Sequence, residues 1–168
     1  MLQAAIKIGH LSLLKYNLIF KKTYWLILLS SILNFNINPV NAQNNITINK
    51  DTVVEPLSVT GTSGGTIEAQ QITQTENTPT GYCEGFTTQQ PNHIFNIDTF
   101  FDYLRLEVES TTDTTILVRG PGGVWCNDDV TSANPTIEGQ WQPGVYQVWV
   151  GSYQADSNDN YTIKITGR

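Results

Sequence analysis

Residues 144–166 read GVYQVWVGSYQADSNDNYTIKIT, and this stretch decides the fold class of the chain. Apolar and polar side chains alternate in its first part (residues 145–153) and in its last part (residues 161–166), and a run rich in Asp, Ser and Asn separates the two. Alternation with a period of two residues indicates half-buried β-strands, and Asp, Asn and Ser are favoured turn residues. The stretch therefore predicts two strands joined by a polar turn.

The alternation also predicts which side chains face the core. Residues 103–109 show the same pattern, and the apolar members of the three runs are Leu104, Leu106, Val108, Tyr146, Val148, Val150, Tyr161, Ile163 and Ile165. Antiparallel sheets commonly have one buried face and one wet face. Gln147, Trp149 and Tyr153 are therefore expected on the wet face of the strand at residues 145–153.

Similar short runs, separated by turns rich in Gly, Pro, Asn and Asp, continue through the chain from residue 56 to residue 168. Strands are expected at residues 57–60, 66–71, 93–97, 103–109, 114–119, 136–141, 145–153 and 161–166. About eight short strands in a segment of this length suit an all-β, two-sheet sandwich or jelly roll. The preceding residues 43–55 are expected to be a polar lead-in to this domain.

The N-terminus has the pattern of a signal peptide. Lys21 and Lys22 precede an apolar stretch at residues 24–33, which is too short to cross a bilayer as a helix. Val40 and Ala42 suit the small-residue positions before a cleavage site, so cleavage is expected after Ala42. The prediction is a secreted or periplasmic protein with no membrane span in the mature chain; a retained anchor is the alternative.

Charge and cysteine content agree with export. The chain has 9 Lys and Arg and 15 Asp and Glu, a net charge of −6, and all of the acids lie after residue 50. Such a surface repels nucleic acid and anionic lipid, whereas cations, polysaccharide and protein stay open as partners. Cys83 and Cys126 are the two cysteines. An isolated pair in an oxidising compartment is expected to form one disulfide, worth about 4 kcal/mol in the chain-entropy model.

An ordered series of motifs resembles the bacterial pre-peptidase C-terminal domain. The motifs are Asn-Asp-Asp at residues 127–129, Pro-Gly-Val-Tyr at 143–146 and Tyr-Thr-Ile-Lys-Ile at 161–165. The segments at residues 56–65 and 91–93 further resemble a secreted, mostly uncharacterised subgroup from cyanobacteria. The resemblance spans residues 56–168 and implies an antiparallel β-sandwich of jelly-roll type. It also implies an accessory or substrate-adhering role beside exported enzymes, although this domain is expected to stand alone after a signal peptide.

Calcium is the cofactor that the sequence suggests, because some members of that family bind it. Calcium takes six to eight oxygen ligands from flexible loops. Asn127, Asp128 and Asp129 offer such oxygens, as does a second loop at residues 156–160. The alternative is that these residues only stabilise turns.

The sequence contains no convincing catalytic constellation. His93 is the only histidine after residue 42, and no Gly-x-Ser-x-Gly motif accompanies it. Trp149, Tyr153 and Gln147 are the candidate surface for carbohydrate or protein, although rings that cover a sheet or fill a second layer of the sandwich are the interpretation that the sequence favours. The functional hypothesis is a non-catalytic binding, adhesion or accessory module. The alternatives are a structural envelope or matrix component and an inhibitor or accessory subunit of an exported hydrolase.

Overall fold

The computed structural model describes residues 44–128 and 134–168, so the predicted signal peptide lies outside the described part. The elements in chain order are β1 (Asn44–Ile48), β2 (Leu57–Thr62), β3 (Ile67–Glu68), α2 (Ala69–Thr73), β4 (Asn77–Thr78), β5 (Gly81–Tyr82), β6 (Phe86–Thr87), β7 (His93–Ile97), β8 (Phe101–Ser110), β9 (Thr114–Gly120), β10 (Gly123–Asn127), β11 (Thr136–Trp141), β12 (Gly144–Ser152) and β13 (Asn160–Gly167). No helix in these ranges is long and apolar enough to cross a membrane.

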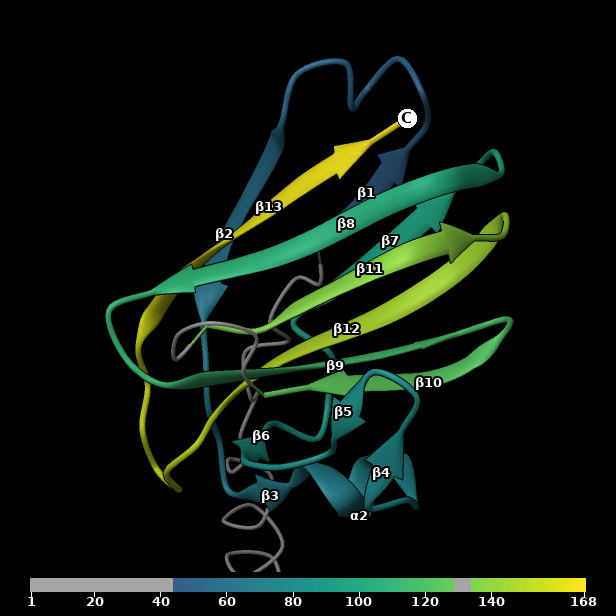
Figure 1. The fold of residues 1–168 in the computed structure, drawn as a ribbon. Coiled ribbons are helices and arrows are strands. Elements are labelled where there is room, and N and C mark those ends of the chain that lie inside the picture. The colour runs from purple at the N-terminus through teal and green to yellow at the C-terminus, as the bar shows by residue number, and fades with distance from the viewer. Residues whose placement is uncertain (1–43, 129–133) are drawn as a thin grey trace, which may run out of the picture. The chain divides into compact units, whose positions relative to one another are not determined.

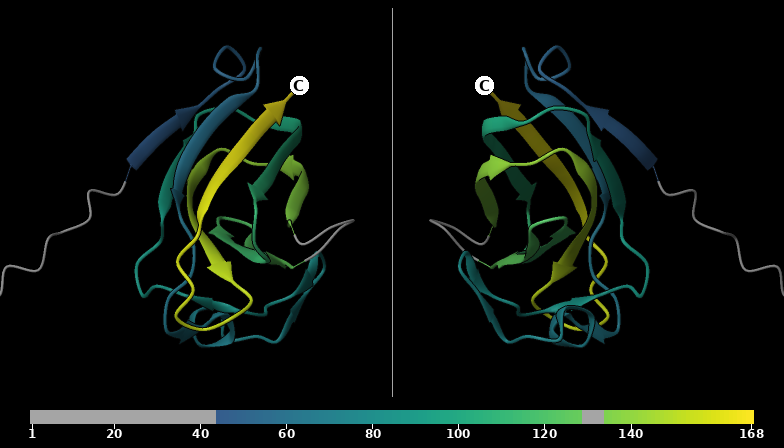
Figure 2. Two further views of the ribbon diagram at one scale, coloured as in Figure 1. Left: turned by 90° about the vertical axis from the view of Figure 1, so that its left-hand side faces the viewer. Right: turned by 90° about the vertical axis from the view of Figure 1, so that its right-hand side faces the viewer.

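Two sheets pack face to face (Figures 1 and 2). The four-stranded sheet has the order β11-β8-β13-β2. In the seven-stranded sheet, β1, β7 and β12 follow one another, β12 also pairs with β9 and β6, and β10 and β3 complete the sheet. From β7 to β13 the chain changes sheet at every connection except the β9–β10 hairpin. The predicted all-β class and the antiparallel sandwich of jelly-roll type are thus confirmed.

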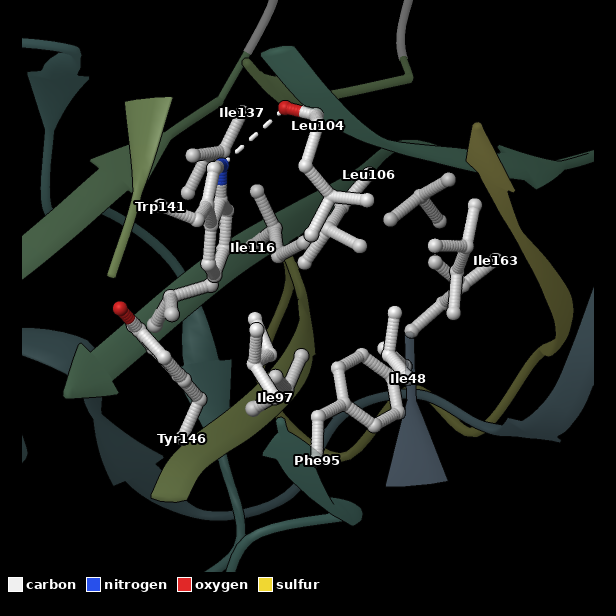
Figure 3. Packing of buried hydrophobic residues seen from close by; sticks show 14 of the residues in the cluster. Ile48, Phe95, Ile97, Leu104, Leu106, Ile116, Ile137, Trp141, Tyr146 and Ile163 are labelled. Atoms are coloured by element: carbon white, nitrogen blue, oxygen red, sulfur yellow. Dashed lines mark hydrogen bonds between the residues drawn. The ribbon is translucent and has the colours of Figure 1, made fainter. Parts of the chain in front are cut away.

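The core lies between the sheets and contains the side chains that the alternation predicted to face inward (Figure 3). All nine of them are at most 3% exposed. Full burial of one such apolar side chain contributes roughly 1.5–3 kcal/mol. Trp141 joins this core, and its indole nitrogen donates a hydrogen bond of 3.1 Å to the carbonyl of Leu104. This bond satisfies the polar atom that burial of the indole ring takes away from water.

The sequence suggested a polar lead-in at residues 43–55, but the described part of this segment, residues 44–55, belongs to the folded domain. Strand β1 pairs in parallel with β7, residue by residue from Asn44 opposite His93 to Ile48 opposite Ile97. Ile48 is fully buried, and Val53 is 5% exposed. The Ile-Thr-Ile alternation of β1 is too short to stand out in a polar stretch, but it is enough to place Ile48 against the core.

The strand predicted at residues 66–71 is also wrong. Only β3 is extended there, and the short helix α2 follows it at once. Ala69, Ile72 and Thr73 are buried while the glutamines between them are exposed, which is the i, i+3, i+4 spacing of a helix. The prediction also missed β10 and the two-residue strands β4, β5 and β6. Helix α2 and the two-residue strands gather at one end of the sandwich, the lower end in Figures 1 and 2.

The buried position of Ile48 can be tested by mutation. Ile48→Ala should lower the free energy of unfolding by about 2–4 kcal/mol, because it leaves a cavity in the core. Val54→Ala is the control, since Val54 belongs to the same segment but is 77% exposed, and it should change stability by less than about 0.5 kcal/mol. Urea unfolding followed by circular dichroism measures both. Equal stability of the two variants would show that β1 is not part of the folded domain.

Candidate functional site

The cap, defined as residues 67–87, lies at one end of the seven-stranded sheet: β3 and β6 extend this sheet, and the rest of the cap packs on its outer face. It carries β3, α2, β4, β5 and β6. Under it lies a second apolar cluster composed of Ala69, Ile72, Cys83, Leu117, Cys126 and Trp149. The cluster joins the cap to the outward-facing side chains of β9, β10 and β12, so this part of the molecule has three layers.

Trp149 is therefore buried, whereas the alternation in the sequence suggested that it lies on a wet face. Its side chain is only 3% exposed, because the cap covers the outer face of β12 at this position. The guanidinium of Arg119 lies 5.8 Å from the centroid of the indole ring and also donates a hydrogen bond to the carbonyl of Ile72 in α2. Trp149 is a packing residue of the second cluster, and it cannot contact a ligand while the cap is in place.

The disulfide fixes the cap to the sheet. Cys83, which follows β5, is bonded to Cys126 of β10 with an S–S distance of 2.05 Å. Both cysteines are 1% exposed. The hydroxyl of Thr80 adds a hydrogen bond of 2.8 Å to the carbonyl of Cys126. The cap is thus held by a covalent bond, polar contacts and apolar burial together.

Tyr153, unlike Trp149, is exposed as predicted. It follows β12, its ring is 49% exposed, and its backbone N–H donates to the carbonyl of Asp113 at 3.2 Å. It borders an open pocket of about 490 Å³ at the edge of the cap. The pocket is also lined by the side chains of Glu68, Gln70, Glu84 and Phe86.

The polar side chains of this Tyr153 pocket are free to bind a ligand. Within the described ranges, the carboxylates of Glu68 and Glu84 and the carboxamide of Gln70 form no hydrogen bond or ion pair. The backbone around them is fixed, because the N–H of Ala69 donates to the carbonyl of Gly85 at 2.9 Å. The pocket therefore combines two aromatic rings with carboxylate and amide groups on a rigid frame.

The prediction from sequence missed the cap side of this pocket. Residues 66–71 were interpreted as a strand, which hid the turn that brings Glu68 and Gln70 together with Glu84. Gln147, the third residue predicted for the surface, is half-buried in the middle of β12 opposite Ile94 and does not border the pocket. Of the three predicted surface residues, the structure places only Tyr153 at a pocket.

The first predicted calcium loop begins with Asn127, whose side chain is already hydrogen-bonded within the domain. Asn127 is 8% exposed; its Oδ1 accepts the N–H of Thr136 at 2.9 Å, and its Nδ2 donates to the carbonyl of Thr80 at 3.0 Å. Asp128 is half-buried, and Asp129 lies outside the described residues. In the described ranges no three or more His, Cys, Asp and Glu side chains come together in a group that can hold a metal.

The second loop, between β12 and β13, is bound to the segment after β2. Asp159 accepts the hydroxyl of Ser157, and Asn158 donates to the carbonyl of Asp156 at 3.2 Å. The carbonyl of Asp159 accepts the N–H of Ser63 at 2.8 Å. These contacts are the turn-stabilising role that the sequence left open as the alternative to calcium binding.

His93 belongs to the core. A hydrogen bond of 2.8 Å joins its Nε2 to the hydroxyl of Tyr161, and the two residues are 2% and 3% exposed. Burial lowers the pKa of His93 and raises the pKa of the Tyr161 hydroxyl. Gly61 leaves the space for this pair, because a Cβ at that position would lie 2.3 Å from the Tyr161 hydroxyl. The pair stabilises the sandwich and is not accessible to a substrate.

The outer face of the four-stranded sheet has a different character. Its charged side chains pair with one another: Lys164 with Glu109, and Arg105 with Glu107 at 2.9 Å. The hydrogen bond to Glu109 raises the pKa of Lys164. At the end of this face, where β2, β13 and β8 lie side by side, is a second shallow groove of about 720 Å³.

Known proteins that are similar to this chain include a cyanobacterial protein and a solved bacterial domain. No family model matches the chain. An uncharacterised protein of Synechococcus elongatus is 36% identical over 66 residues, which are 39% of this chain and 48% of that protein. The match therefore spans about half of the relative's length. The pre-peptidase C-terminal domain of a collagenase from Bacillus anthracis is similar in structure, with a TM-score of 0.44 and 10% identity over 73% of this chain and 95% of that domain.

The buried His93 should make the stability of the protein depend on pH. Its folded-state pKa lies below the unfolded value of about 6.5, so the unfolded chain binds the proton more tightly. Its contribution is fully present above about pH 6.5 and falls as the pH drops, by at most about 1.4 kcal/mol per pH unit.

Urea unfolding at about pH 7.5 and about pH 5 measures this effect. His93→Gln keeps a hydrogen-bonding group for Tyr161 but cannot titrate, so this variant should lose less stability between the two pH values than the natural protein. The same loss in both proteins would mean that other groups carry the acid sensitivity.

Proposed function

We propose that this chain is an exported, non-catalytic module that binds an extracellular polysaccharide through the Tyr153 pocket. One observation carries the proposal: an exposed aromatic ring lies beside three polar side chains that have no partner within the described part of the chain. Buried or paired polar groups usually serve the fold, whereas free ones around a pocket are available to a ligand.

The chemistry of the pocket suits a sugar. The C–H groups of a sugar ring pack on an aromatic face such as that of Tyr153. Carboxylates such as Glu68 and Glu84 accept hydrogen bonds from hydroxyl groups, and charge-assisted hydrogen bonds are stronger than neutral ones. An anionic ligand is disfavoured by these carboxylates and by the net charge of −6.

The alternative of a purely structural component is supported by one observation, the burial of Trp149. Burial of both Trp149 and Tyr153 would favour a structural role. Only Trp149 is buried, and Tyr153 is 49% exposed. The exposed ring therefore favours the binding role.

The proposed absence of catalysis rests on the use of His93 in the core and on the placement of the acids. Glu68 and Glu84 are the carboxylates of the Tyr153 pocket, so a glycosidase that cleaved a polysaccharide bound in this pocket would use them. Incubation with a bound polysaccharide should release no reducing ends. Release that Glu84→Gln abolishes would replace the binding proposal by a glycosidase.

Tyr153→Ala should weaken polysaccharide binding about tenfold or more, because it removes the exposed ring. Affinity electrophoresis in gels containing cellulose derivatives, xylan, mannan or glucan measures the change. Phe100→Ala is the matched control, since Phe100 is an exposed aromatic residue directly before β8 and does not line the Tyr153 pocket.

The control variant should bind as tightly as the natural protein. If both variants bind equally well, Tyr153 is not part of the binding site. If no polysaccharide in the gel slows the migration of the natural protein, the polysaccharide proposal fails, and a protein partner becomes the next candidate.

Calcium dependence stays a prediction and has its own test. A ligand that binds only the folded state raises the melting temperature by mass action. If calcium binds at the loop after β10, millimolar calcium should raise the melting temperature relative to excess chelator, and Asp128→Asn should remove the shift. Asp51→Asn, in an exposed loop, is the control. An unchanged melting temperature in calcium would exclude the site at that concentration.

A further inference from the structure

The groove on the four-stranded sheet is a trough between two cross-strand rows of side chains. One row is Thr60, Thr162 and Glu109, and the other is Thr62 and Asn160, with Thr111 in the lining directly after β8. Between the two rows lie Gly61 of β2 and Tyr161 of β13, which are opposite each other in the sheet. The Tyr161 side chain points into the core. Residues two apart on a strand are about 7 Å apart and share a face. The groove therefore crosses three strands and has backbone as its floor and polar side chains as its walls.

The walls of this groove have unused hydrogen-bonding groups. Within the part of the chain that the structure describes, the side chains of Thr60, Thr62, Thr111, Asn160 and Thr162 form no hydrogen bond. Four are hydroxyls and one is a carboxamide, so all of them both donate and accept. Further along this face several polar groups are paired, as in the hydrogen bond of 2.8 Å from the Tyr103 hydroxyl to Glu138.

The groove carries no free charge. Its one charged side chain, Glu109, forms an ion pair with Lys164. A cationic ligand therefore finds no unpaired carboxylate here, and an anionic ligand is repelled by the net charge of −6. No aromatic face lines the groove, because Tyr161 is 3% exposed. Hydrogen bonding to uncharged groups is the interaction that this surface offers.

The surrounding structure holds the groove in shape. The hydrogen bond of Tyr161 to buried His93 fixes the middle row from below. The hydroxyls of Ser63 and Ser152 are 2.9 Å apart in the interior, which fixes the end of β2 to the end of β12. A preformed surface binds with a smaller loss of conformational entropy than a flexible one.

We propose that this hydroxyl groove is a second contact surface for an uncharged polysaccharide. The proposal rests on the proposed function, because it gives the same class of ligand a further site. The groove and the Tyr153 pocket lie at the same end of the sandwich, and the loop from Tyr153 to Asn160 connects them. The Tyr153 pocket supplies an aromatic ring on which a sugar can stack. The groove supplies unused hydrogen-bond donors and acceptors for the hydroxyl groups of the ligand.

The test uses isothermal titration of the purified protein with neutral hexasaccharides of the cello-, xylo- and manno- series. Thr60→Val combined with Thr162→Val removes two hydroxyls but keeps β-branched side chains of the same shape. Each lost hydrogen bond should raise Kd about two- to tenfold. Thr166→Val is the matched control, because Thr166 lies on β13 two positions beyond Lys164 and outside the groove.

The result expected is a weaker Kd for the double variant, an unchanged Kd for Thr166→Val and an additional loss in Tyr153→Ala. If the double variant binds like the natural protein while Tyr153→Ala binds weakly, the groove proposal fails and the Tyr153 pocket stands. If only the double variant is impaired, the groove stands and the pocket proposal fails. Absence of heat with every hexasaccharide overturns both.

Discussion

Strand β12 buries side chains on both of its faces, and the rest of the domain is arranged around that constraint. Tyr146, Val148 and Val150 fill the core between the sheets, and Trp149 points the other way. A two-layer sandwich would leave that indole ring in water. The cap provides a third layer over it, and the apolar surface that the ring and Leu117 remove from water stabilises the cap in return.

The cap is too small to hold its position by secondary structure alone. Its helix has five residues and its strands two each, far below the length at which an isolated helix is stable. The bond from Cys83 to Cys126 and the contact of Arg119 with Ile72 compensate, since each connects the cap to a long strand of the sheet. The Tyr153 pocket is formed where this fixed cap meets the end of β12, so the site depends on the buried indole ring.

The sequence predicted the long strands well because each contains enough alternating residues to distinguish a sheet from a helix. Strand β8, with Leu104, Leu106 and Val108 all fully buried, is the clearest case. The cap could not be predicted in the same way, because elements of two to five residues show no period. The alternation of β12 correctly placed Trp149 on the face away from the core. It could not show that a segment far earlier in the chain covers that face.

The distribution of charge distinguishes the surfaces of the domain by role. On the middle of the four-stranded sheet, acids and bases neutralise each other, as Lys164 of β13 does with Glu109 of β8 and Arg105 with Glu107 along β8. Exposed pairs of this kind contribute little to stability, but they leave no free group for a ligand. At the end near the cap, Glu68 and Glu84 have no such partner in the described chain, and the hydroxyls around Thr162 are also free. Both pockets lie at this end of the sandwich. The fold therefore leaves carboxylates and hydroxyls there that a ligand can bind.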